Sequence, residues 1–388
     1  MGRYDVAVVE SRDEFGDILH DWQALLDEAP EGANWRNDPA RVAAVLASKP
    51  ALIPWIVLVR ERGVLCCVAP FYLAGDQLAF KVRGRTLCSL PVRLLYLFGD
   101  DVVRTPGTDT DAVAVVFEEL FRRRNRFDVL SLQGVDPGNA VGRYCTSRAA
   151  ADGFRVVPAS TLERVHRIVL PPTYEDYLAT LGARTRQNLR RTTRRLFDEG
   201  RARVLKVETA EQVPAFLAQL DAVAGQTWQA AVLGLPHRNS HAERSVFEAL
   251  AARGWLRAYL LLYDDVPIAY ELGVQYRGTF YGHECGYDQR WADRGPGSVL
   301  MHLVIADLFK DYRPSVLHFG FGDATYKRSL GSNDGHDARH LFLVTRWRWH
   351  FALQVQRTLA RASEAAKPPM SRQAGFASTE PGDPVGMR

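Results

Sequence analysis

Cysteine is scarce in this chain, and its spacing argues against cross-linking by disulfides or by metal. Five cysteines occur in 388 residues, at positions 66, 67, 88, 145 and 285. An odd, scattered set without CxxC spacing indicates neither a disulfide framework nor a structural zinc site. We therefore expect reduced thiols and no bound metal, with Cys66 and Cys67 packed among small apolar residues.

Long apolar runs are also missing. The stretch from Ala51 to Val59 ends at Arg60, well short of the roughly 20 residues with which a helix crosses a bilayer. No spanning helix is predicted. The first five residues have no apolar segment behind them, and Val6 stands where a myristoylation signal has Ser or Thr. The sequence therefore predicts a cytoplasmic protein.

Charge of one sign is hardly in excess, because 49 Lys and Arg face 45 Asp and Glu, a formal net charge of +4. An anionic partner must then be bound by a local basic cluster, and DNA is not expected as a partner. Hydrophobic residues make up 47% of the chain and charged residues 24%, which is a globular composition. At this length we expect two domains.

The first half of the chain has the pattern of a mixed α/β sheet covered by helices. Ser11 and Glu14 form a capping box before one helix, and Pro39 fits the first position of the next. The predicted elements are a strand at Val6–Val9, helices to Leu26 and Ser48, strands at Trp55–Arg60 and Val64–Leu73, a helix at Ala112–Arg123, a strand at Phe127–Gln133 and a helix at Ala140–Ala151. This first domain is predicted at residues 1–165, with a boundary near Pro171.

The second half repeats this order with clearer signals. Capping boxes at Thr209 and Ser240 begin two helices, and an antiparallel meander follows. The later elements are strands at Leu256–Leu262, Ile268–Gln275 and Thr279–Cys285, a helix at Val299–Lys310, a strand at Val316–Phe321, a short helix with Tyr326 and Lys327, and a strand at His340–Thr345. This second domain is predicted at residues 171–346, followed by a helix at 347–363 and a disordered tail at 364–388.

A glycine-containing turn, Asp293–Ser298, joins the meander to its next helix. Gly295 and Gly297 let backbone N–H groups approach a ligand closely, and a helix N-terminus carries partial positive charge, so the turn suits a pyrophosphate. The alternative is a helix start that only needs a turn, and one GxG by itself does not decide between the two.

A basic segment precedes these elements and is predicted to form a helix at 184–199. Its arginines would form two neighbouring rows, and two leucines would leave a narrow apolar seam. The arginines are Arg184, Arg186, Arg190, Arg191, Arg194 and Arg195, and the leucines are Leu189 and Leu196. The helix is either a solvated connection between domains or a face for an anionic partner: a phosphate-rich acceptor, a polyanionic glycan or transfer RNA.

Several short motifs of the second half occur together in one known superfamily. They are Val266-Pro267-Ile268-Ala269, Gly286-Tyr287-Asp288, Gly295-Pro296-Gly297 with Leu300, Gly322-Asp323-Ala324-Thr325-Tyr326-Lys327, and the basic stretch from Arg184 to Arg191. They resemble the GNAT acetyltransferase superfamily, and within it the FemAB-like, cellulose-biosynthesis-associated (CelD/BcsL-type) acyltransferases. The resemblance implies an α/β protein of two tandem GNAT-like folds, each with a mixed sheet.

The resemblance also implies a place for an acyl-CoA. In such folds the strand before the glycine turn separates from its neighbour and binds the pantetheine arm, while the next helix receives the pyrophosphate. The matching positions are Glu284, Cys285 and Gly286 for the arm, and Arg294, Gly295, Gly297 and Ser298 for the phosphates. The chain departs from the usual loop at Ala292, where Gln or Arg is common, so Arg290 or Arg294 would have to substitute.

Acyl transfer from a thioester needs a base for the attacking group and often an acid for the departing thiolate. Tyr326 is the candidate acid, because similar folds often place a tyrosine there; the alternative is a structural tyrosine. His283 and Glu284 are candidate bases, and since adjacent strand residues face opposite sides only one can face the cleft. We favour Glu284. His318 is a third candidate base, with a packing role as its alternative.

Three charged residues are candidates for binding the substrate in addition to Arg190. Glu271 lies in the centre of the meander, where a carboxylate needs a partner or a role in the site. Asp323 and Lys327 either bind an anionic substrate or pair with each other at the surface.

These observations lead to one function and two alternatives. The first is an acyl-CoA-dependent N- or O-acyltransferase, an acetyltransferase, that uses acetyl-CoA or another acyl-CoA and a small-molecule or glycan acceptor. The resemblance implies a sugar or polysaccharide precursor as that acceptor. The alternatives are a FemAB-like aminoacyl-tRNA-dependent transferase and a non-catalytic GNAT-fold interaction protein. The first half is expected not to bind CoA, because Thr105–Asp109 offers one glycine and an acid where phosphate would lie.

Overall fold

A computed structural model of the chain describes residues 3–28, 30–82, 85–108, 110–198, 200–227, 240–311, 313–321, 327 and 329–365. The chain divides into two compact units. The first holds the residues up to Leu162 and those from Asp337 through the last helix, and the second is Glu163–His336. No helix in the described ranges is long and apolar enough to cross a membrane.

The first unit is a mixed sheet with strand order β1-β2-β3-β4-β6-β14. All of these pairs are antiparallel except β4 with β6. Its elements are β1 (Tyr4–Val9), α1 (Arg12–Asp27), the 3-10 helix Trp35–Asn37, α2 (Pro39–Ser48), β2 (Ile53–Glu61), β3 (Val64–Val82), β4 (Arg85–Leu97), β5 (Val103–Arg104), α3 (Thr110–Arg122), β6 (Val129–Val135), α4 (Ala140–Ser147) and β7 (Arg155–Pro158). The predicted cap is present, since the Ser11 hydroxyl accepts from the Glu14 N–H at 3.2 Å.

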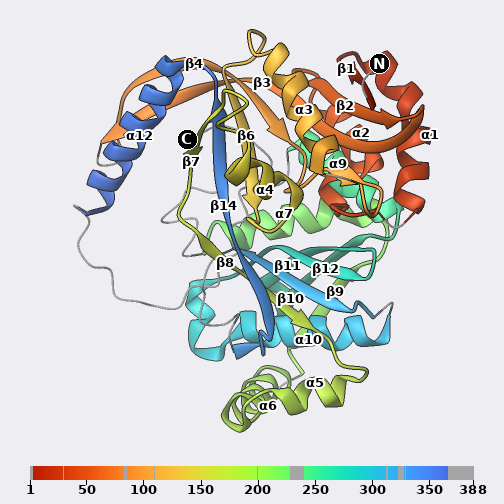
Figure 1. Cartoon of the computed structure of the whole chain (residues 1–388). Coiled ribbons are helices and arrows are strands. Elements are labelled where there is room, and N and C mark those ends of the chain that lie inside the picture. The colour runs from red at the N-terminus through yellow and green to blue at the C-terminus, as the bar shows by residue number, and fades with distance from the viewer. Residues whose placement is uncertain are drawn as a thin grey trace. The chain divides into compact units, whose positions relative to one another are not determined.

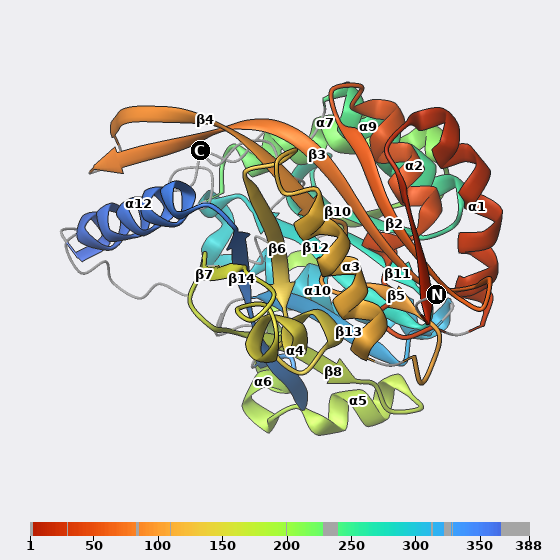
Figure 2. The same cartoon turned by 45° about the horizontal axis from the view of Figure 1, so that its top comes forward.

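The hairpin of β3 and β4 is far longer than the pattern predicts, and its outer part forms an arm (Figure 2). Residues 85–91 of β4 are all exposed. With both faces in solvent, these residues have no reason to alternate apolar with polar side chains, so the periodicity that reveals a strand is missing.

The last strand, β14 (Asp334–Val344), belongs to the first unit from Asp337 onward, whereas the sequence pattern predicts a second domain that runs to residue 346. The reason is its pairing. Arg339–Leu343 pair with β6, Leu341–Val344 pair with β7, and Leu341 and Leu343 enter the first unit's core. Strand partners far apart in sequence leave no local signal.

The final helix, α12 (Trp347–Ala365), also packs in the first unit. The Trp349 indole Nε1 donates to Asp128 Oδ1 at 3.0 Å, and Gln356 donates to the carbonyl of Ala79 on β3. Figure 2 shows α12 beside the arm of β3 and β4. The predicted disordered tail lies outside the described residues after Ala365.

The second unit is a sheet with strand order β8-β13-β12-β11-β10-β9, in which only β12 and β13 are parallel. Its elements are β8 (Glu163–Val169), α5 (Tyr174–Thr180), α6 (Ala183–Phe197), β9 (Ala202–Val207), the 3-10 helix Ala210–Gln212, α7 (Val213–Ala224), α9 (His241–Ala252), β10 (Leu256–Tyr263), β11 (Val266–Tyr276), β12 (Thr279–Tyr287), the 3-10 helix Gln289–Arg294, α10 (Pro296–Lys310) and β13 (Val316–Phe321). Helices α7 and α10 both contact the central strands β10, β11 and β12 (Figure 1).

The core of this unit forms where α10 meets the sheet. An apolar face of α10 that includes Leu300, Val304 and Leu308 packs on Tyr259 and Phe280 of the strands. Burying such side chains contributes about 1.5–3 kcal/mol each relative to exposure. The position of α10, and therefore of the glycine turn at its start, is fixed by this packing.

Candidate functional site

The two parallel strands of the second unit separate after a short ladder. Pairs form at Thr279–Tyr281 of β12 with Val316–His318 of β13, and the ladder ends there although β12 continues to Tyr287. Along residues 282–287 the edge of β12 that faces β13 therefore has no ladder partner among the described residues. Backbone N–H and C=O groups need partners when they are buried, so this edge suits an amide-containing chain that binds as an extra strand.

Strand β12 has a bulge at the point where it leaves β13. Leu272 of β11 pairs with Glu284 and the next residue, Gly273, pairs with Gly282, so His283 has no residue opposite. The prediction that His283 and Glu284 face opposite sides depended on regular alternation, which a bulge breaks. Strict alternation therefore cannot decide which of the two serves as the base.

Side-chain contacts distinguish these two residues. The Glu284 carboxyl is buried and accepts from the Tyr270 hydroxyl, with an O–O distance of 2.8 Å. The His283 ring packs beside Phe247 of α9, with ring centroids 5.9 Å apart. Glu284 is therefore held by a polar partner on the neighbouring strand, which fixes the orientation of its carboxyl group.

A second buried carboxyl lies close by on β11. Glu271 is opposite Cys285 of β12 and is 2% exposed. Burial raises the pKa of Glu271 well above its ordinary value, the charge of Glu284 raises it further, and a hydrogen bond with the Cys285 thiol opposes the shift. The neutral carboxyl of Glu271 is favoured, which removes the cost of burying a charge.

The glycine turn forms the N-terminus of α10 as the sequence predicts. Gly295 is the N-cap with φ +60°, a left-handed conformation that favours glycine, and no side chain caps the helix. Val299 N–H bonds the Gly295 carbonyl at 3.1 Å, so the N–H groups of Gly297 and Ser298 precede the first helical bond. The first turn contains no acidic residue. These features favour an anion.

The arginines of the turn itself are engaged elsewhere. Arg290 Nη2 bonds the Asp288 carboxylate at 2.6 Å. The Arg294 guanidinium lies over the rings of Tyr263 and Trp291, about 5 Å from each centroid. Neither arginine therefore replaces the Gln or Arg that similar loops have at the position of Ala292.

Positive charge reaches the turn from α6 instead. The Thr192 methyl lies 3.8 Å from the point where a Cβ on Gly295 would be, so α6 lies directly against the N-cap of α10. A hollow of 560 Å³ opens beside it, and none of the described residues that line it is acidic. Its lining includes Arg184, Asn188, Arg191, Thr192, Ser298 and His302. Within the part of the chain that the structure describes, Arg184 has no ion pair and Arg191 bonds only Asn188, at 3.0 Å.

His302 is a site residue that the sequence pattern did not single out. It follows Ser298 by one helical turn, is 5% exposed and lines the hollow. Burial lowers its pKa to about 4, so its imidazole is neutral at neutral pH. Its Nδ1 has no hydrogen-bond partner among the described residues. The signal available in the sequence is a polar residue in the otherwise apolar run Val299–Ala306.

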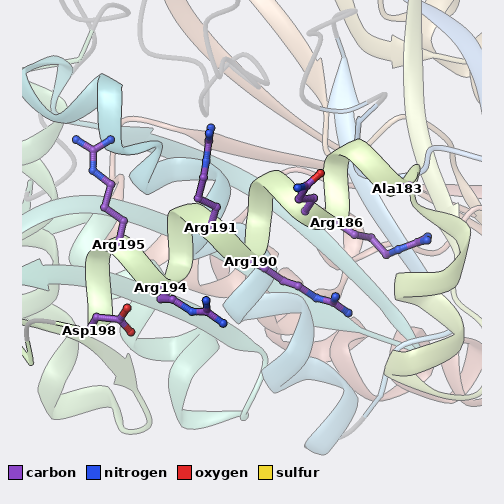
Figure 3. Close-up of a pocket in the computed structure, with 8 residues that line it drawn as sticks. Ala183, Arg186, Arg190, Arg191, Arg194, Arg195 and Asp198 are labelled. Carbon is purple, nitrogen blue, oxygen red and sulfur yellow. The ribbon is translucent and has the colours of Figure 1, made fainter.

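Other predicted residues lie at the end of β13 or outside the described ranges. His318 accepts from the Gly320 N–H at 3.3 Å and lies beside Tyr281. Lys327 is fully buried, and its ammonium donates to the carbonyls of Gly320 and Phe321, so it holds the end of β13. Tyr326 and Asp323 lie outside the described residues. Arg190 is exposed on the other side of α6 (Figure 3).

Residues 183–328 match the family model of an acetyltransferase (GNAT) domain. The crystal structure of FemX is similar over 90% of this chain and 100% of its own, with a TM-score of 0.60 and 10% identity. A tandem GNAT protein from the clavulanic acid biosynthesis pathway is similar over 88% of this chain and 98% of its own, with a TM-score of 0.52 and 13% identity. No curated protein matches the chain. At such identities the likeness shows the fold, and the predicted tandem GNAT-like α/β fold is confirmed.

Proposed function

We propose that this tandem GNAT-fold protein is an acyl-CoA-dependent N- or O-acyltransferase whose second unit binds the donor and performs the transfer. The observation that carries the proposal is the hollow at the N-terminus of α10, which Arg184 and Arg191 of α6 line and which has no acidic residue among its described lining. It combines helix N–H groups that precede the first helical hydrogen bond with two arginine side chains, which is the recognition that a diphosphate requires.

The separation of β12 from β13 supports a binding surface for the pantetheine arm of the donor. An extended pantetheine arm carries amide groups, and the edge of β12 at residues 282–287 offers backbone groups to pair with them. The thioester end would then reach the part of β12 that holds Glu284. Acyl-CoA supplies the activated acyl group, and the protein's own residues bind, orient and move protons.

Glu284 is the proposed base. It takes the proton from the acceptor nitrogen or oxygen as that atom bonds the thioester carbon, the carbon–sulfur bond breaks, and the thiolate leaves with a proton from an acid. The Tyr270 hydroxyl positions the carboxylate by its 2.8 Å bond. Tyr326 is the proposed acid, from the motif that resembles other GNAT proteins.

The acceptor class rests on the motifs shared with cellulose-biosynthesis-associated acyltransferases, so we propose a sugar or polysaccharide precursor. A second candidate donor is an aminoacyl-tRNA. It is favoured by the surplus of cations on α6, where Arg190 and Arg194 lie outside the hollow beside Ser298.

Calorimetry on the full chain with acetyl-CoA, and then with free CoA, tests the donor. We expect binding of both, and an affinity about tenfold weaker in Arg191→Gln because a charge-assisted hydrogen bond is lost. Arg85→Gln is the matched control, since Arg85 is an exposed arginine of β4 whose side chain has no hydrogen bond or ion pair with any described residue. No heat at millimolar ligand, with retention of the chain on immobilised transfer RNA, would replace CoA by the second candidate.

A further inference from the structure

A second hollow lies across α6 from the one beside Ser298. It measures 470 Å³ and is bounded by α5, α6 and α10, a volume typical of small-molecule sites. Leu178, Leu189, Phe197 and Leu303 supply apolar surface, and arginines border it. Figure 3 shows Arg186, Arg190 and Arg194 directed to one side of α6 and Arg191 and Arg195 to the other. The same helix therefore borders both hollows, and Leu189 and His302 line both of them.

The arginines that border this hollow differ in what they already bind. The Arg186 guanidinium donates to the carbonyls of Leu178, Ala179 and Leu181, which end α5. The guanidinium groups of Arg190 and Arg194 have no hydrogen bond or ion pair with any described residue, and the two residues are one helical turn apart. Asp198, one further turn along, is the acidic residue of the lining. Two adjacent cations are thus available above an apolar floor.

His302 adds a polar group to that floor. It lines this hollow as well as the first, is 5% exposed, and its Nδ1 has no hydrogen-bond partner among the described residues. A buried polar atom without a partner is uncommon and costs free energy unless a ligand or water satisfies it. The neutral imidazole suits an uncharged oxygen near the head of a ligand.

We propose that this hollow binds an amphipathic phosphate monoester, with its aliphatic chain on the leucine and phenylalanine surface and its phosphate between Arg190 and Arg194. A phosphate monoester carries a charge of about −1.5 to −2 at pH 7, which matches two guanidinium groups better than a carboxylate does. The chain accounts for the apolar floor, which a free anion or a glycan would leave uncovered. This site is additional to the proposed donor site and does not depend on it.

Calorimetry on the full chain with monomeric octyl phosphate tests the proposal, with inorganic phosphate and 1-octanol as the two halves of the ligand. Octyl phosphate should bind at least about tenfold more tightly than inorganic phosphate or 1-octanol, because apolar burial and charge pairing act together. The double variant Arg190→Gln/Arg194→Gln should reduce its affinity to that of octanol. Leu178→Ser should weaken octyl phosphate and leave inorganic phosphate unchanged.

The control is Arg184→Gln, which removes a charge from the same helix on the side of the first hollow. It should keep octyl phosphate affinity, whereas the proposed donor site predicts weaker CoA binding in that variant, so the two proposals fail separately. Equal affinities for octyl and inorganic phosphate, or an unchanged double variant, would overturn the site. So would binding to vesicles of phosphatidic acid without binding of monomeric octyl phosphate, or loss of octyl phosphate binding at saturating CoA.

Discussion

The two units share an order of elements but differ in where their one parallel ladder lies. In the second unit the ladder is at the start of β12, and in the first it joins Leu94–Tyr96 to β6, next to the end of β4 at Leu97. Beyond its ladder, β12 continues for six residues, 282–287, whose edge towards β13 has no ladder partner among the described residues, whereas β4 continues for one residue, Leu97. The position of a three-residue ladder along its strand thus decides whether the end of that strand has an open edge for a ligand.

The helices that follow β12 and β4 in the chain, α10 and α3, also differ in how well their N-termini suit an anion. Helix α10 begins with glycines and no acid, whereas α3 has Asp111 in its first turn, bonded by Arg148. In the connection before α3, the Asp101 carboxylate accepts from the Val141 N–H at 3.1 Å and from Arg104. The first unit therefore satisfies its donors and cations with its own carboxylates.

The largest effect in this comparison is expected for Glu284→Gln. It removes the proposed base and keeps an oxygen for the Tyr270 hydroxyl, so the rate should fall by about 100- to 10,000-fold with little loss of folding. Thiol release from acetyl-CoA, with water as acceptor, measures it. Tyr270→Phe should act through Glu284 and shift the pH profile of that rate. An unchanged rate in Glu284→Gln would remove the base from the proposal.

Ser298→Asp should have the next largest effect, because it gives α10 the acidic first turn that α3 already has. The new carboxylate would repel the diphosphate and weaken CoA binding by about 100-fold. The wild-type chain should bind one CoA. The reverse change, Asp111→Asn, should add no second site, since β4 continues for only one residue, Leu97, beyond its ladder with β6. Calorimetric stoichiometry measures both, and two CoA molecules per wild-type chain would contradict the difference between the units.

Much of this fold follows from local signals in the sequence. The capping box of Thr209 and Gln212, the cap at Ser240 and the proline at the first position of α2 all form as predicted. Each depends on residues within one turn of each other, so the physics that decides it is local. The apolar spacing of α7 similarly predicts which of its faces is buried.

The missed features depend on contacts far apart in sequence. The bulge at His283 needs the register of β11, and the place of α6 against Gly295 joins residues about a hundred positions apart. The boundary predicted near Pro171 differs from the division at Leu162 because β8 joins the second sheet by pairing with β13. The sequence predicts both the basic helix and the glycine turn, but it does not predict that they lie next to each other.

Among the described residues, each unit also holds one histidine whose pKa is lowered to about 4: the buried His302 in the second and the partly buried His340 in the first. Burial is the main cause in both, and Arg36 adds to it for His340. The unfolded chain binds the proton with a pKa near 6.5. The contribution of each neutral histidine to the free energy of unfolding is therefore complete above that pH and is lost as the pH falls through about 4. For His302 the loss is about 3 kcal/mol.

His302→Gln should therefore reduce the fall of the second unit's free energy of unfolding between pH 7 and 4, and leave that of the first unit unchanged. Its cost at neutral pH should be small, because Nδ1 has no described partner to lose. His340→Gln is the counterpart, and it should cost stability at neutral pH because its Nδ1 accepts from the Gly134 N–H at 3.0 Å. Denaturant titrations between pH 4 and 7 measure these effects, and an unaltered pH dependence in His302→Gln would contradict the assignment.

The smallest effect is expected at Arg294, the arginine of the glycine turn that was predicted to reach the phosphates. Its guanidinium lies over Tyr263 and Trp291, and such a contact contributes about 0.5–1 kcal/mol at a partly exposed site. Arg294→Gln should lower the melting temperature slightly and change CoA affinity by less than about threefold, against about tenfold for Arg191→Gln. The reverse order in calorimetry would mean that the turn, rather than α6, supplies the charge that distinguishes the second unit from the first.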